Sequence, residues 1–203
     1  MARDVKDAVN SYITDMLALE DDFEKALGAQ VRDYENERPE VIAQLRRIHS
    51  LCEQHIRNLN DLTERRGVGK GLAETVKRAG STLAGIAGAA INVIRSEKLP
   101  KSLRDDFTAM NLASIGYTML YTTARSLDEP TVAEVALRHL RDYSEAVLVL
   151  HNLIPSAVVN FLQEDGLPAN QEVLPEVYRT LDEVWRNVNA VASGTAQHPG
   201  FNR

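Results

Sequence analysis

The chain is organised around the stretch from Arg46 to Ile56, RRIHSLCEQHI. It holds the only cysteine and two of the five histidines, and it lies in the middle of a long helical pattern. At helical spacing, Cys52 and His55 fall on the apolar side of this helix, whereas His49 lies towards the edge. Side chains at mid-height in a helical bundle are where metal ligands are found. The stretch therefore predicts a bundle helix, over residues 39–65, with a candidate site on its inner face.

A helix of similar length precedes this one. Apolar residues recur at steps of three and four over residues 4–36, which predicts a helix there. The apolar stripe is interrupted once, where Glu20 stands in the position of a core residue. We expect Glu20 to face the second helix. In the absence of a metal, its carboxylate is expected to pair with His55, Tyr117 or Tyr121.

The remaining apolar patterns are also helical, and no strand pattern or short repeat is evident. Two long helices, a connecting helix and two more long helices predict two antiparallel pairs joined by one crossover, which is the ferritin-like way of building a four-helix bundle. The later helices are expected over residues 71–96, 101–127 and 131–153, with Pro155 kinking or restarting the fifth before it continues to residue 163, and a last helix over 172–191.

The connecting helix is rich in small residues between positions 79 and 90. Gly80, Ala84 and Gly88 recur at intervals of four, which lets a backbone approach a neighbouring helix closely. The bulky apolar face of a membrane-surface helix is missing here. We therefore expect close packing within the protein or across a dimer, in preference to membrane contact.

The composition narrows the functional class. The chain has 203 residues and a formal net charge of -6, so it offers no basic footprint for nucleic acid. Its single cysteine cannot form an internal disulfide, which favours a reducing compartment. No basic-then-apolar leader and no run of about 18 uncharged apolar residues is present. We expect a cytoplasmic protein.

Four segments resemble a known family. LALEDDFEKAL at residues 17–27 and CEQHIRNL at residues 52–59 are similar to the first two helices of the YciE/YciF-like proteins, a bacterial stress-associated branch of the ferritin-like superfamily. Ser126-Leu127 before an acidic turn, and Leu140-Arg-Asp142, are similar to the fourth and fifth helices. The resemblance covers roughly residues 10–150. It implies a ferritin-like fold and a di-iron centre.

In that family the centre takes a carboxylate from each of two helices and a Glu-x-x-His or similar pair from each of the other two. Glu20 matches the first-helix carboxylate and His55 the second-helix ligand, but Cys52 stands where the partner glutamate is expected. On the later helices, carboxylates are replaced at Met110, Ala113 and Tyr143, and only Asp142 is acidic.

This loss of acidic groups leaves two alternatives for the site. Two iron ions carry at least four positive charges, which so few carboxylates balance poorly. A single softer ion such as Zn(II) could use Glu20, Cys52 and His55, with water or Asp142 as the fourth ligand. These four residues are the candidate metal ligands, and iron or zinc is the alternative to a chain without a cofactor.

Each candidate residue also has a purely structural interpretation. Cys52 is expected as a small core residue, and His55 as a hydrogen-bonded core histidine. His49 is expected at the surface. His139 and Asp142, three residues apart, would suit either the edge of a metal site or a pair on one helix face, and we favour the pair.

We therefore predict an all-α, ferritin-like bundle over residues 1–153, including the crossover helix 71–96. A C-terminal helical extension, 154–192, is expected to pack on it, followed by a flexible tail, 193–203. The favoured function is a non-catalytic, stress-associated protein that acts as a homodimer or through an unidentified protein partner, with packing surfaces on the small-residue helix and on the last helix, which carries Trp185. The alternative is a metal-binding protein in oxidative stress or metal handling.

Overall fold

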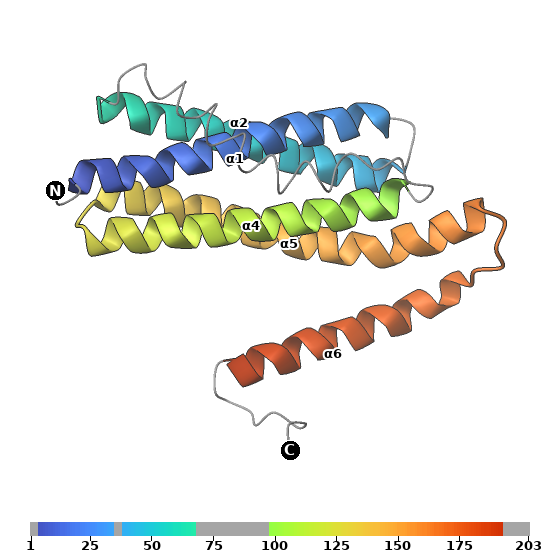
Figure 1. Ribbon diagram of the computed structural model, residues 1–203. Coiled ribbons are helices and arrows are strands. Elements are labelled where there is room, and N and C mark those ends of the chain that lie inside the picture. The colour runs from blue at the N-terminus through green and yellow to red at the C-terminus, as the bar shows by residue number, and fades with distance from the viewer. Residues whose placement is uncertain (1–3, 35–37, 68–97, 193–203) are drawn as a thin grey trace. The chain divides into compact units, whose positions relative to one another are not determined.

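The structure is a computed structural model that describes residues 4–34, 38–67 and 98–192. All regular secondary structure in these ranges is helical, which confirms the all-α prediction for them. The predicted crossover helix 71–96 and the tail 193–203 lie outside the described residues. The elements are α1 (Val5–Asp33), α2 (Pro39–Arg65), α4 (Lys98–Ser126), α5 (Pro130–Glu164), the short 3-10 helix η1 (Gln171–Val173) and α6 (Leu174–Ala192), shown in Figure 1.

The helix boundaries follow the predicted ones closely. Of the kink or restart predicted at Pro155, the restart is absent, because α5 continues through Pro155 to Glu164 as one helix. Proline inside a helix costs about 3 kcal/mol because it removes one hydrogen bond and crowds the preceding turn. The apolar, helix-forming turns on both sides of Pro155 outweigh that cost. The last helix is also preceded by η1, where the Asn170 side chain accepts a hydrogen bond from the Glu172 amide at 2.9 Å.

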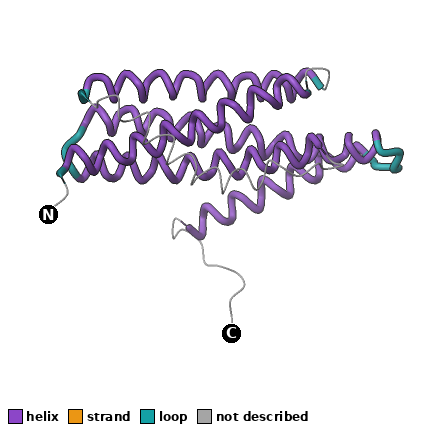
Figure 2. The backbone as a smooth tube through the Cα atoms, turned by 45° about the horizontal axis from the view of Figure 1, so that its top comes forward, coloured by secondary structure: helices purple, strands orange, loops and turns teal. Residues whose placement is uncertain are grey.

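The chain divides into two compact units, Met1–His151 and Asn152–Arg203, which we call the bundle unit and the C-terminal unit. In the bundle unit, α1 packs against both α2 and α4. Figures 1 and 2 show the four helices running alongside one another, with α1 antiparallel to α2 and α4 antiparallel to α5. The end of α2 and the start of α4 lie at opposite ends of this unit, so α2 and α4 run in the same direction.

One end of the bundle unit is held by Arg66, which follows α2. Its guanidinium donates two hydrogen bonds to Glu129, at 2.6 and 2.9 Å, and one to the Asn10 side chain, at 2.7 Å. The hydrogen bonds from Arg66 lower the pKa of Glu129. Asp128, beside Glu129, has φ of 56°, a left-handed conformation that aspartate tolerates at a helix end. These contacts join the end of α2 to α1 and to the turn between α4 and α5.

A glycine on α4 sets how closely α1 and α4 approach. A Cβ atom at Gly116 would lie 2.5 Å from the Met16 sulfur, so no larger residue fits without movement of a buried side chain. Tyr117 follows directly and is completely buried. The close approach at Gly116 therefore brings the Tyr117 side chain within reach of polar groups on α1.

Helix α5 is both long and apolar. Among the described residues it is the one helix that is long and apolar enough, by length and composition alone, to cross a membrane. The expectation that no segment is this apolar is therefore not met. Core helices of soluble proteins, which are mostly buried, pass the same test, but only 22% of the apolar window of α5 is buried.

Candidate metal centre

Glu20 is fully buried on α1, and both of its carboxylate oxygens accept hydrogen bonds. The Tyr117 hydroxyl donates to Oε1 at 2.5 Å, and His55 Nδ1 lies 3.0 Å from the same oxygen. The Tyr143 hydroxyl donates to Oε2. Burial and the adjacent Glu20 carboxylate raise the pKa of both tyrosines well above the usual value, so they remain donors. The predicted pairing of Glu20 with His55 and Tyr117 is confirmed.

His55, on α2, lies between two carboxylates. Its Nδ1 faces Glu20, and its Nε2 lies 3.1 Å from Asp142 Oδ2 on α5. Each ring nitrogen therefore faces a carboxylate oxygen, and an imidazole bonds to a carboxylate by donating an N–H. Glu20, His55 and Asp142 form a continuous chain of contacts from α1 through α2 to α5.

His139 is the member of the site that the sequence pattern did not identify. It is completely buried, and its ring stacks on that of His55 with 3.8 Å between ring centroids. Its Nε2 lies 3.1 Å from the Asn58 side-chain nitrogen, whereas its Nδ1 has no hydrogen-bond partner among the described residues. Burial, with the positive charges of His55 and Arg138, lowers the pKa of His139 to about 2. It is therefore a neutral imidazole at physiological pH.

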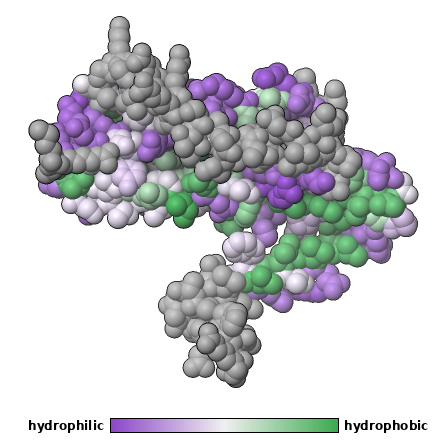
Figure 3. All heavy atoms as spheres, viewed as in Figure 1, coloured by the Kyte–Doolittle hydropathy of each residue, from purple (hydrophilic) through white to green (hydrophobic). Residues whose placement is uncertain are grey.

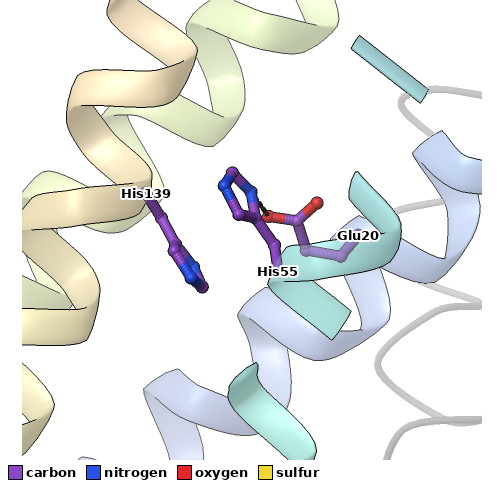
Figure 4. Close-up of side chains that lie close together, drawn as sticks. All are labelled: Glu20, His55 and His139. Atoms are coloured by element: carbon purple, nitrogen blue, oxygen red, sulfur yellow. Dashed lines mark hydrogen bonds and ion pairs between the residues drawn. The ribbon is translucent and has the colours of Figure 1, made fainter. Parts of the chain in front are cut away.

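These side chains bring three possible ligands together, which we call the inner trio: Glu20, His55 and His139. One ligating atom from each lies within 4.8 Å of the others, and all three residues are buried. Figure 4 shows that they reach the same point from α1, α2 and α5. The predicted His139–Asp142 pair on one helix face is not formed, because His139 points at His55 and Asn58 instead.

Cys52 is completely buried on α2, one turn before His55, as the helical phase predicts. Its sulfur lies 3.4 Å from the Tyr143 hydroxyl oxygen. Burial, reinforced by the Glu20 carboxylate, raises the pKa of the thiol. Since the thiolate is the ligand and the nucleophile, Cys52 as placed is a protonated core residue.

The structure thus gathers all four predicted ligands but gives them different surroundings. Glu20 and His55 belong to the inner trio, Asp142 contacts the outer nitrogen of His55, and Cys52 contacts Tyr143. His139 was missed because it was placed beside the predicted apolar stripe of the fifth helix, which ran through Leu140. The stripe is otherwise largely as predicted, with Val132, Ala136, Tyr143 and Leu150 buried, but between Ala136 and Tyr143 the buried residue is His139, whereas Leu140 is half-buried.

A di-iron centre does not fit the residues present. Around Glu20, the described carboxylates are those of Glu20 itself and Asp142, because α4 and α5 contribute Tyr117 and Tyr143. Two carboxylates supply two negative charges against at least four positive charges on two iron ions, which is unfavourable in a buried site. One divalent ion is balanced by the same two carboxylates.

Comparison with known proteins gives no family assignment, since the chain matches no protein-family model and no curated protein.

Proposed function

We propose that the protein is a metal-binding helical bundle of the ferritin-like type, which holds a single divalent ion between Glu20, His55 and His139. The observation that carries this proposal is the buried cluster itself: one ligating atom each from Glu20, His55 and His139 lies within 4.8 Å of the others, and His139 Nδ1 has no hydrogen-bond partner among the described residues. A buried polar atom without a partner costs about 1–3 kcal/mol, and coordination of an ion removes that cost.

The contacts that His55 and His139 make through Nε2, on the side of each ring away from the proposed ion, support this proposal. In metal sites, a ligating imidazole commonly donates its other N–H to a carboxylate or carbonyl group. His55 has Asp142 at Nε2, and His139 has the Asn58 amide at Nε2. As placed, the Asn58 side-chain nitrogen donates to His139 Nε2, which leaves the ring proton on Nδ1. Coordination through Nδ1 requires the Asn58 amide to turn, so that its oxygen accepts from Nε2–H and Nδ1 carries a lone pair.

An ion at the inner trio would be held by the Glu20 carboxylate, by His55 Nδ1 and by a ring nitrogen of His139. A proton on His55 Nδ1 would leave to solvent when the ion binds, and the N–H at Nε2 that faces Asp142 would remain. Two histidines and one carboxylate with an open position suit Zn(II) or Fe(II). We favour a role in metal handling, because the two-iron charge requirement is not met.

Zinc titration of the purified chain tests the proposal. His139→Gln is expected to remove one bound Zn²⁺ per chain relative to wild type. Loss of a residue that merely hydrogen-bonds to a metal ligand already weakens metal affinity roughly 10–100-fold, and His139 is proposed as a ligand itself. The matched control is His151→Gln, the same change on the same helix outside the inner trio, which should leave zinc binding unchanged. Titration in two buffers of different protonation enthalpy should also show one proton released per inner ion. Unaltered zinc binding by His139→Gln would contradict the proposal.

Self-association is the second candidate, favoured by apolar side chains on the outside of each unit. In the bundle unit, Ile115 and Met119 are exposed one turn apart on α4. In the C-terminal unit, apolar side chains gather on the described part of α6 (Figure 3), and Val184 is exposed. Light scattering of wild type and of Ile115→Ser/Met119→Ser tests this candidate. It predicts a dimer that the double variant weakens, and a monomeric wild type would contradict it.

A further inference from the structure

A second group of ligands lies on the outer side of α1 and α2, and we call it the outer trio: Glu24, His49 and Glu53. His49 Nε2 is 3.0 Å from Glu24 Oε1, and one ligating atom from each of the three residues lies within 4.8 Å of the others. All three are half-buried, so an ion can reach them from solvent.

The position of the outer trio follows from the geometry of two antiparallel helices. Glu24 is four residues after Glu20 on α1, one helical turn further along. On α2, which runs the other way, His49 and Glu53 are four residues apart and share a face, on the N-terminal side of His55. The outer trio therefore sits about one turn away from the inner trio along the same pair of helices.

A glycine makes room for the imidazole of His49. A Cβ atom at Gly28 would lie 3.1 Å from His49 Nε2, tighter than ordinary van der Waals contact. Gly28 is one turn after Glu24, inside a helix where alanine is favoured over glycine by about 1 kcal/mol. The absence of a side chain at this position lets His49 lie across α1 with its Nε2 beside Glu24.

We propose that the outer trio is a second divalent-cation site, with Zn²⁺ as its ligand, separate from the inner trio. Two carboxylates balance the charge of one such ion, and the imidazole adds a nitrogen donor that zinc favours over calcium or magnesium. The guanidinium of Arg32 also lies near Gly28, 3.6 Å from the same Cβ position. Its positive charge reduces the affinity of the outer trio for zinc, so Arg32→Gln strengthens binding there.

The site is tested by zinc titration with native mass spectrometry on the whole chain. His139→Gln, which lacks a complete inner trio, is expected to retain one Zn²⁺ per chain. His49→Gln/His139→Gln is expected to retain none, and His151→Gln/His139→Gln is the matched control that retains one. Failure of the outer site appears as equal zinc content in His139→Gln with and without His49→Gln. Failure of the inner site appears separately, as no loss on His139→Gln alone.

Gly28→Ala provides a second variant that keeps every ligand. Its Cβ atom displaces the His49 ring by a few tenths of an ångström, so zinc affinity at the outer trio is expected to fall roughly 10-fold or more, comparable to the loss of a residue that hydrogen-bonds to a metal ligand. The folded chain should be as stable as wild type or slightly more so, because alanine favours the helix. Zinc affinity equal to that of wild type, measured in the His139→Gln background, would show that His49 is no ligand and only an ion-pair partner of Glu24.

Discussion

The inner and outer trios use the same types of side chain on the same two helices, yet their surroundings differ. The inner trio is completely buried, and every oxygen of Glu20 is engaged by His55 and two tyrosines. The outer trio is half-buried, with one imidazole–carboxylate contact and access to water. Burial makes the inner residues essential to the fold whether or not a metal binds, whereas the outer residues can be changed at little cost.

Glu20→Ala should have the largest effect. It removes the acceptor of the Tyr117 and Tyr143 hydroxyls and the carboxylate partner of His55 Nδ1, all of them buried, so unfolding free energy should fall by roughly 3–5 kcal/mol. Glu24→Ala, one turn along in the outer trio, should change it by no more than about 0.5 kcal/mol. Urea denaturation of metal-free protein measures both. Equal losses at the two positions would show that burial does not distinguish the trios.

Tyr143→Phe should have the next largest effect. The substitution keeps the ring and removes one hydrogen bond to the buried Glu20 carboxylate, for an expected loss of roughly 1.5–3 kcal/mol. Tyr121→Phe, on a half-buried ring of α4, is the control and should stay within about 0.5 kcal/mol. A small loss for Tyr143→Phe would mean that water or another donor replaces its hydroxyl.

The pH dependence of stability should also report on the inner trio. The folded-state pKa of His139 is lowered to about 2, so its contribution is present above about pH 6.5 and is lost as the pH falls towards 2. Burial raises the pKa of Asp106, on α4, to about 7, so its contribution is present below about pH 4 and is lost as the pH rises to 7. The two trends oppose each other between about pH 4 and 6.5.

Two variants separate the contributions of His139 and Asp106 to the pH dependence of stability. In Asp106→Asn, stability should fall on acidification by up to about 1.4 kcal/mol per pH unit below pH 6.5, because only the His139 trend remains. In His139→Gln, stability should instead rise on acidification from pH 7 to pH 4. Denaturant titrations across this range measure the slopes, and identical slopes in both variants would contradict the assigned burial of these groups.

The smallest expected effects on stability are those of alanine substitutions at two glycines, Gly116 and Gly28. At Gly116 an added methyl group meets the buried Met16 side chain at 2.5 Å, and overpacking of this kind costs about 1–3 kcal/mol, more than the roughly 1 kcal/mol gained in helix propensity. Gly116→Ala should therefore destabilise the chain by about 1 kcal/mol. Gly28→Ala meets the half-buried His49 and should be neutral or stabilising. Thermal unfolding of both variants tests this order.

The sequence alone was sufficient to predict burial where it depends on the periodicity of a residue's own helix. Helical phase placed Glu20, Cys52 and His55 on the inner faces of α1 and α2, and all three are buried. It also offered Tyr117 as a partner of Glu20, and that hydrogen bond is present. The ferritin-like family, the dimer and the stress role stay predictions.

Residues whose role depends on another helix were harder to predict. The apolar stripe of α5 could be drawn through Leu140 or through His139, and only packing against His55 decides between them. Glu24 was not identified as a candidate ligand from the sequence, because its contact with His49 arises between two helices. The spacing of Glu24 from Glu20 by four residues was the available signal, since it repeats the position of a known inward residue one turn on.

Anomalous diffraction from zinc-soaked crystals tests the single-ion inner site most directly. The proposal predicts a peak bonded to Glu20, His55 and His139, with zinc–nitrogen distances of about 2.0–2.1 Å, that is lost in His139→Gln and retained in His49→Gln. Crystals with zinc bound at the surface but no peak at the inner trio would contradict it, as would a peak that persists unchanged in His139→Gln.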